Sequence, residues 1–192
     1  MFRVIPWSSS LDLTQFYLEA SKRGFENNAT EKMLVDSFNN EREKQVWILY
    51  FNNHPIGSVA AHSFDEVMGT NSYRIAARTC VFTDKIKNSY GTALRTKSVI
   101  TENQNPTAQF LIPTCIEWAP KGSRLYITSN QSNVGTQRRV HNIFGPLMER
   151  QGMMKRIKET EYRGHLQTIW ELFPDKFYEI LNKYPRWEYE KI

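Results

Sequence analysis

The chain has 192 residues, a mass of 22.6 kDa, and 40% apolar and 13% aromatic residues. This length and composition favour one globular domain with a single core over residues 1–192, and they exclude an intrinsically disordered chain. No run of uncharged apolar residues reaches the roughly 18–20 that a membrane span needs. The formal charge of +5 has two interpretations. The protein has a solvated basic face, or it binds an anionic partner such as a nucleic acid or a phosphorylated cofactor.

The N-terminus and the cysteines bear on location and metal chemistry. The start Met1–Trp7 has neither the apolar stretch of a secretory signal nor the Arg/Ser-rich character of a transit peptide, so we expect a cytoplasmic protein. Cys80 and Cys115 each lie inside an apolar run, which predicts buried free thiols. The four histidines and two cysteines show no ligand spacing, and we therefore expect no metal site.

A short strand and two helices are predicted first. The strand covers residues 2–7, and Ser8–Ser10 offer N-cap hydroxyls to a helix that ends at Gly24. Thr30 is the predicted cap of the second helix. The inward positions are Leu13, Phe16, Tyr17 and Ala20 in the first helix, and Met33, Leu34 and Phe38 in the second.

Three consecutive antiparallel strands follow. Residues 46–51 are β-branched and aromatic, as in a strand that is buried on both faces, and residues 52–57 carry turn chemistry. Residues 58–64 are the predicted return strand, and after a loop the alternation over 73–83 predicts a third strand.

The next helix has two possible positions. It covers either residues 91–100 or a segment that Asn105-Pro106-Thr107 opens and that continues to Trp118, with a kink at Pro113. The sequence does not choose between the two.

The remaining segments complete a mixed order. We predict a strand over 124–129, a helix over 134–151 that bends or restarts at Gly145-Pro146, and strands over 154–162 and 165–173. A terminal helix starts at Pro174 and covers the core. The whole order predicts an α+β fold, with a mixed, mostly antiparallel central sheet flanked by helices.

This order of elements, over about residues 2–173, resembles the GCN5-related N-acetyltransferase (GNAT) superfamily, with the C-terminal helix and tail 174–192 added. The resemblance implies an acyl-CoA N-acyltransferase fold. In that fold the fourth and fifth strands, here 73–83 and 124–129, part into a V that admits acetyl-CoA as co-substrate.

The resemblance also implies a cofactor site. The superfamily's pyrophosphate loop, Arg/Gln-x-x-Gly-x-Gly/Ala, matches best at residues 86–91, where Gly91 agrees but Ile86 and Ser89 depart from the pattern. If Pro106 opens the helix instead, the N–H groups of residues 107–109 face the phosphates. The implied cofactor-binding residues are Cys80, Val81 and Phe82 along the pantetheine arm, Lys85, Lys87 and Gly91 at the diphosphate, and Asn130 after the fifth strand.

No catalytic residue is identified. The superfamily's general acid, a Tyr in Tyr-x-x-x-Gly-Phe, falls on Met148, whose thioether cannot protonate a leaving thiolate, whereas Gly152 keeps its role as the helix stop. The other candidates are His62, Glu117, Tyr126 and Tyr162. A hydrogen-bonded histidine at a strand end is favoured for His62 and the polar face of a helix for Glu117, and Arg163-Gly164 is assigned to a structural turn.

Two functions remain open. The first is an acyl-CoA-dependent N-acetyltransferase that transfers the acetyl group directly to an unidentified amine. The alternative is a catalytically inactive binding or assembly protein of the same fold, which contacts nucleic acid or an acidic protein surface through the basic stretch 121–163. The sequence favours the first.

Overall fold

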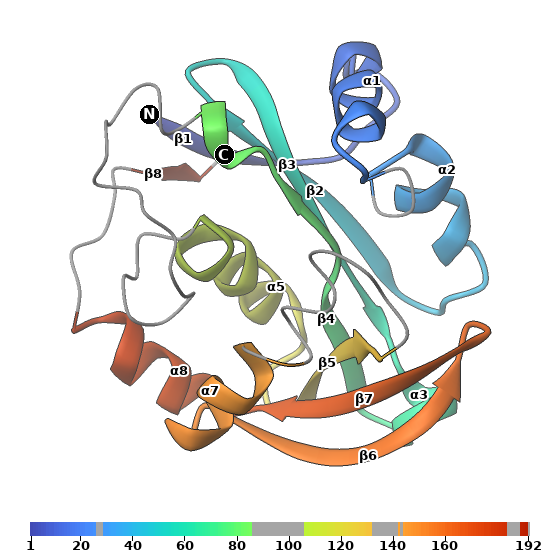
Figure 1. The fold of residues 1–192 in the computed structure, drawn as a ribbon, viewed down its shortest axis with the longest axis vertical. Helices are drawn as coiled ribbons and strands as arrows, with labels where there is room; N and C mark the ends of the chain where they lie inside the picture. The colour runs from blue at the N-terminus through green and yellow to red at the C-terminus, as the bar shows by residue number, and fades with distance from the viewer. Residues whose placement is uncertain (26–28, 86–105, 132–141, 143, 184–188, 192) are drawn as a thin grey trace.

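Eight strands form one mixed sheet in the computed structural model, which describes residues 1–25, 29–85, 106–131, 142, 144–183 and 189–191 (Figure 1). The sheet order is β6-β7-β5-β4-β3-β2-β1-β8, and its pairs are antiparallel except for β4 with β5 and β1 with β8. The predicted mostly antiparallel α+β sheet is therefore confirmed. The strands are β1 Phe2–Pro6, β2 Lys44–Phe51, β3 His54–Ser63, β4 Ser72–Val81, β5 Arg124–Asn130, β6 Met154–Tyr162, β7 His165–Leu172 and β8 Tyr189–Lys191.

Helices cover both faces of this sheet. In Figure 1, α1 and α2 lie on one side, and α5, α7 and α8 lie on the other. The helices are α1 Thr14–Lys22, α2 Glu31–Leu34, the 3-10 helix η1 Asp36–Phe38, α3 Asp65–Met68, the π-helix η3 Thr107–Leu111, α5 Ile112–Trp118, α7 Gly145–Arg150 and α8 Pro174–Leu181. Each face of the sheet therefore has an apolar layer against it.

The β2–β3 hairpin is tighter than predicted. Asn52 and Asn53 form its two-residue turn with φ of 47° and 66°, a left-handed geometry that asparagine tolerates better than most residues. Because only these two residues turn the chain, β3 begins at His54 and not at residue 58. The predicted antiparallel order of β2, β3 and β4 is confirmed.

The N-terminal caps agree with prediction at one helix and differ at the other. Thr30 Oγ1 accepts a hydrogen bond from the Met33 N–H at 3.3 Å, as predicted for α2. The prediction that Ser8–Ser10 cap α1 is wrong: the N-cap is Leu13, and the Asp12 carboxylate accepts from the Thr14 N–H. An aspartate two residues before the helix satisfies one of the free N–H groups that a serine would have taken.

The helix before Trp118 takes the second of its two predicted positions. It continues from the π-helix η3 into α5, whereas residues 91–100 lie outside the described part of the chain. Pro113 lies where the π-helix η3 gives way to α5, so regular α-helical bonding begins only beside it, and the predicted kink at Pro113 stays a prediction.

Of two C-terminal elements, the first agrees with expectation and the second was not predicted. Of the helix predicted over 134–151, the structure describes α7, which begins at Gly145 with Pro146 in its first turn, so the helix restarts there. The tail after α8 contributes β8, which pairs in parallel with β1 from Phe2↔Tyr189 onward. Three residues carry too little pattern for a strand prediction.

Candidate functional site

β4 and β5 are joined at one end and separate at the other. Their parallel pairing covers Ser72↔Arg124, Tyr73↔Leu125 and Arg74↔Tyr126, whereas the strands continue to Val81 and Asn130. Beyond the last pair, β4 stays bonded to β3 and β5 stays bonded to β7. The predicted V between the fourth and fifth strands is confirmed, and we call the separation between the backbones of their unpaired ends the gap (Figure 1).

Two bulges in β4 bend it away from β5. Between the pairs His62↔Arg74 and Ala60↔Ala77, and again between Ala60↔Ala77 and Ser58↔Cys80, β4 advances three residues while β3 advances two. The bulges coincide with left-handed backbone at Ala76 (φ 53°) and Arg78 (φ 52°). An extra residue on one strand increases its local twist and disrupts the ladder, so these two positions account for the separation of the strands.

The backbone of Val81 is turned toward the gap. The Phe82 N–H donates to the Ile56 carbonyl at 2.7 Å, so the backbone N–H of Phe82 points toward β3. The backbone of Cys80, two residues earlier and opposite Ser58, points the same way. Because N–H groups alternate in direction along an antiparallel pair, the N–H and C=O of Val81, opposite Gly57, point away from β3. Of the three residues expected along a pantetheine arm, Val81 is thus the one that presents its backbone to the gap.

The side chains at this end of β4 are buried or paired. Phe82 packs on Phe16 of α1 with ring centroids 5.2 Å apart. The Arg23 guanidinium covers Phe82 at 4.7 Å and donates to Asp84 at 3.0 Å. Lys85 lies on the surface with its Nζ 3.3 Å from Glu19 of α1. These contacts fix the start of the segment after β4 on α1.

The remaining predicted cofactor residues fall in two places. Lys87 and Gly91 lie outside the described residues. Asn130 ends β5, is 8% exposed, and stands opposite Gln167 of β7. Asn130 is thus on the β5 side of the gap, across from the end of β4.

The position expected for a general acid is part of the core. Met148 of α7 is 4% exposed. The helix ends in a Schellman motif, in which the Met153 N–H donates to the Met148 carbonyl and the Gly152 N–H, at φ 75°, donates to the Glu149 carbonyl. The predicted helix stop at Gly152 is confirmed, and Met148 supplies packing at this position, because a thioether has no proton to give.

Neither cysteine is a nucleophile. Cys80 and Cys115 are free and buried, as predicted. Burial raises the pKa of each thiol to about 12, because the thiolate would be desolvated. Cys80 is therefore protonated at neutral pH although it lies beside the gap.

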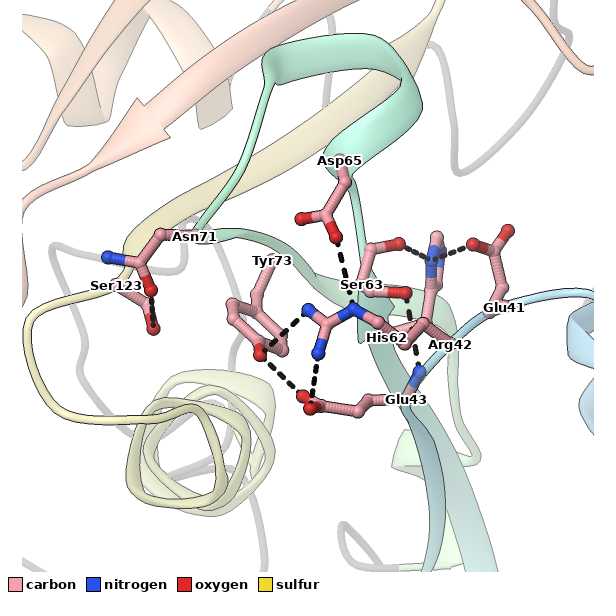
Figure 2. A network of polar contacts seen from close by, with 9 residues as sticks. All are labelled: Glu41, Arg42, Glu43, His62, Ser63, Asp65, Asn71, Tyr73 and Ser123. Carbon is pink, nitrogen blue, oxygen red and sulfur yellow. Dashed lines mark hydrogen bonds and ion pairs between the residues drawn. The ribbon is translucent and has the colours of Figure 1, made fainter.

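His62 is a neutral structural histidine. It is fully buried on β3, and its Nε2 lies 3.2 Å from Nη1 of Arg74, which can only donate. The proton is consequently on Nδ1, which donates to the Ser63 carbonyl at 2.7 Å and lies 3.6 Å from Glu41 (Figure 2). Burial lowers the pKa of His62, and its one lone pair is engaged by Arg74, so it is not placed to act as a base.

The other three candidates lie in different environments. Glu117 is exposed on α5, which covers the opposite face of the sheet from α1 (Figure 1). Tyr126 is fully buried, and burial raises its pKa. Tyr162, at the end of β6, is half-buried, and its hydroxyl accepts from Arg163 Nε at 2.9 Å.

Three arginines lie close to one another where β4 borders the gap. We call Arg74, Arg78 and Arg163 the arginine cluster. Arg74 Nε donates to Thr128 Oγ1 at 2.9 Å, which connects β4 to β5 just beyond their last backbone pair. The Arg74 guanidinium also stacks over Tyr162 at 5.3 Å. Arg78 follows at the second bulge, close enough to Arg163 that the charge of Arg163 lowers its pKa in addition to burial, which is the larger cause.

Arg163 brings the β6–β7 hairpin to this cluster. It has φ of 54° in a two-residue turn with Gly164, so the predicted structural turn is confirmed. Its guanidinium donates to Glu41 Oε1 at 3.0 Å and stacks on Phe38 at 4.9 Å. Sequence reasoning missed this second role, because the contact with Glu41 joins residues 122 positions apart.

The segment that carries Glu41 is held firmly (Figure 2). Arg42 donates to Asp65 at 3.1 Å and to the Tyr73 hydroxyl at 3.2 Å, and that hydroxyl donates to Glu43. The hydrogen bond to His62 is the largest of the causes that hold the pKa of Glu41 below its usual value. Glu41 is thus an ionised, fixed partner for Arg163.

Part of the basic stretch 121–163 is paired where it is described. Arg124 donates to Glu171 at 3.0 Å, Arg156 forms an ion pair with Glu159, and Lys158 donates to a backbone carbonyl of α3. In the described part of the chain, no helix is long and apolar enough to cross a membrane, and no group of three or more metal-binding side chains occurs.

Solved structures share this fold. The chain is similar to a probable acetyltransferase of Staphylococcus epidermidis, at 12% identity and a TM-score of 0.51, over 90% of this chain and 98% of that one. It is also similar to the aminoglycoside acetyltransferase AAC(6')-Ib in complex with coenzyme A and kanamycin, at 12% identity and a TM-score of 0.56, over 93% and 98% of the two chains. No protein-family model and no curated protein matches the sequence. The chain therefore has the fold of the GNAT acyl-CoA N-acyltransferases, as the sequence predicted.

Proposed function

We propose that this chain is an acetyl-CoA-dependent N-acetyltransferase that transfers the acetyl group directly to an amine. The observation that carries the proposal is the bulged end of β4, which leaves β5 after Arg74↔Tyr126 and turns the backbone of Val81 into the gap. A neighbour with the same fold was crystallised with coenzyme A, which supports the same donor here.

The donor binds along β4 in this proposal. An extended arm with amide groups pairs with the exposed N–H and C=O of Val81 as an added strand would. From Val81 back to Arg78, at the nearer bulge, the strand covers only about 10 Å at about 3.3 Å per residue. Lys85, Lys87 and Gly91 hold the diphosphate, and Asn130 lines the β5 side.

The chemistry needs little beyond placement. The amine nitrogen forms a bond to the thioester carbon, the carbon–sulfur bond breaks, and the leaving thiolate takes up the proton that the nitrogen loses. Bulged strands carry N–H groups that the ladder does not use, and such a donor polarises the thioester carbonyl. A transfer through an acyl-cysteine is disfavoured, because the pKa of both thiols is about 12.

Titration calorimetry with acetyl-CoA tests the proposal. We expect saturable binding in the micromolar range for the wild type, as for a typical co-substrate. Val81→Pro removes one N–H that faces the gap while sparing the β3 ladder, and we expect at least tenfold weaker binding. Val81→Ala keeps the N–H and serves as the matched control. Absence of heat at millimolar acetyl-CoA, in a folded protein, contradicts the proposal.

A further inference from the structure

The arginine cluster lies on one defined face of the sheet. Tyr73 packs against Trp118 of α5, with ring centroids 5.7 Å apart. Its neighbour Arg74 points to the opposite face, where its partner His62 packs on Phe38 of η1 at 4.9 Å. The cluster therefore faces the side of the sheet away from α5, at the narrow end of the gap where the two strands begin to part.

The hydrogen-bond partners of Arg74 are neutral. Its hydrogen-bond partners are the imidazole of His62 and the hydroxyl of Thr128, and it is only 9% exposed. Burial is the main cause that lowers the pKa of Arg74 to about 10, and the charges of Arg163 and Arg78 lower it further. Two of its five N–H donors serve these contacts, so donors remain for a ligand. A charge kept at this desolvation cost is typical of a functional site.

The charge of the site is positive after its internal ion pair is counted. Three guanidinium groups, one ionised carboxylate at Glu41 and a neutral His62 leave a net charge of +2 on the described side chains of the site. Glu41 is committed to Arg163, with which it forms a 3.0 Å ion pair. Arg74 therefore keeps its charge beside hydrogen-bond partners that are neutral, His62 and Thr128.

Arginine rather than lysine supplies this charge. A guanidinium presents parallel N–H groups that match the two oxygens of a carboxylate or phosphate. The stack of Arg74 on Tyr162 and that of Arg163 on Phe38 hold the planes of both groups. A fixed, planar donor set recognises an anionic oxygen group with less loss of side-chain entropy than flexible lysines would.

On the basis of the proposed function, we propose that the acceptor amine also carries an anionic oxygen group, a carboxylate or a phosphate, which Arg74 and Arg78 bind at the narrow end of the gap. Arg78 lies at the second bulge of β4, so an acceptor anchored there has its amine near the thioester on the same strand. The net positive charge of the site repels polycationic acceptors. In this respect the site differs in substrate class from that of the neighbour solved with kanamycin, a polyamine.

Matched acceptor pairs test the substrate class. Release of free coenzyme A is followed with amino acids against their amides, and with phosphoethanolamine against ethanolamine. We expect the anionic member of at least one pair to have a kcat/KM more than thirtyfold higher, and the better pair separates a carboxylate from a phosphate. Equal rates within the pairs, or faster reaction of the amides and of ethanolamine, overturn the inference.

Variants of the cluster locate the effect. Arg78→Gln is expected to raise KM for the anionic acceptor at least tenfold, with the Kd for acetyl-CoA within twofold of the wild type. Arg78→Lys is expected to raise this KM less than Arg78→Gln does, since lysine keeps the positive charge but lacks the paired N–H donors of a guanidinium. Arg156→Gln removes an exposed arginine outside the cluster and should change neither constant. An unchanged KM in Arg78→Gln contradicts the assignment.

A binding measurement keeps the two proposals separable. Inorganic phosphate and acetate, compared with chloride at equal ionic strength, are expected to raise the wild-type Tm, and the rise is expected to disappear in Arg78→Gln. No rise in the wild type overturns the anion site even if no tested amine reacts. If acetyl-CoA binds and the anions do not, the further inference fails alone; if the anions bind and acetyl-CoA does not, the proposed function fails.

Discussion

The two ends of the sheet are held together in different ways. β1, β2 and β3 pair through antiparallel ladders with one register shift, between Leu49 and Tyr50, and β2 carries fully buried apolar side chains such as Ile48. β4 and β5 share three backbone pairs, after which a side-chain hydrogen bond from Arg74 to Thr128 connects them. The first region is organised for stability. The region of β4 and β5 lacks backbone hydrogen bonds beyond the last pair and buries the charge of Arg74, and both features are typical of a ligand-binding site.

The largest effect on stability is expected in the regular region. Ile48→Ala removes a fully buried side chain from β2 and should lower the free energy of unfolding by about 2–5 kcal/mol. The residual folded protein should keep its affinity for acetyl-CoA, because Ile48 lies away from the gap. Urea unfolding and calorimetry on the same sample check both statements. If Ile48→Ala lowers the affinity for acetyl-CoA in proportion to its loss of unfolding free energy, the stable region and the site are energetically coupled, which contradicts this account.

An intermediate effect is expected where the regular region meets the bulged strand. A Cβ added at Gly57 would lie 2.6 Å from the Cys80 carbonyl oxygen, so Gly57→Ala must push β3 from the end of β4. We expect a loss of about 1–3 kcal/mol in unfolding free energy, together with weaker acetyl-CoA binding. Gly69→Ala controls for a loss of stability away from the gap, because its φ of 85° strains an alanine although no atom lies within 4 Å of the added Cβ. If the two variants bind acetyl-CoA equally well, the end of β4 does not shape the gap.

A smaller effect on stability and a large one on activity are expected at Arg74. Arg74→Met keeps much of the volume and removes a buried charge, so the unfolding free energy should change by less than about 1.5 kcal/mol in either direction. Acetyl transfer to an anionic acceptor should fall by at least tenfold. Denaturant unfolding and steady-state kinetics measure the two changes. A variant that unfolds readily but turns over normally would assign Arg74 to stability.

The smallest effect concerns pH. The pKa of His62 lies below 6.5 in the folded chain because the imidazole is buried, so protons bind the unfolded chain more readily. Its contribution to stability is therefore complete above about pH 6.5 and is lost as the pH falls toward the folded pKa. His62→Gln should flatten the decline in unfolding free energy between pH 7 and 5.5. Parallel profiles for variant and wild type would place the titration elsewhere.

Local patterns predicted the regular region well and the site poorly. The β-branched and aromatic run 46–51 and the turn chemistry after it predict the hairpin, and Pro174 marks the start of α8, because each signal lies within a few residues. The bulges fall on Ala76 and Arg78, residue types that give no sign of left-handed backbone.

The arginine cluster could not be predicted from local sequence patterns. The sequence predicts Arg74 and Arg78 on one face of a single strand and Arg163 in a turn. Their meeting depends on the parting of β4 from β5 and on the contact of the β6–β7 turn with Glu41. Such contacts depend on tertiary structure, and no spacing in the sequence encodes them.

A crystal structure with bound coenzyme A is the most direct test of the account. We predict the pantetheine arm between β4 and β5, with an amide hydrogen-bonded to the backbone of Val81 and the thiol near the bulges at Ala76 and Arg78. Coenzyme A bound elsewhere, or β4 and β5 paired along their whole length, would contradict it.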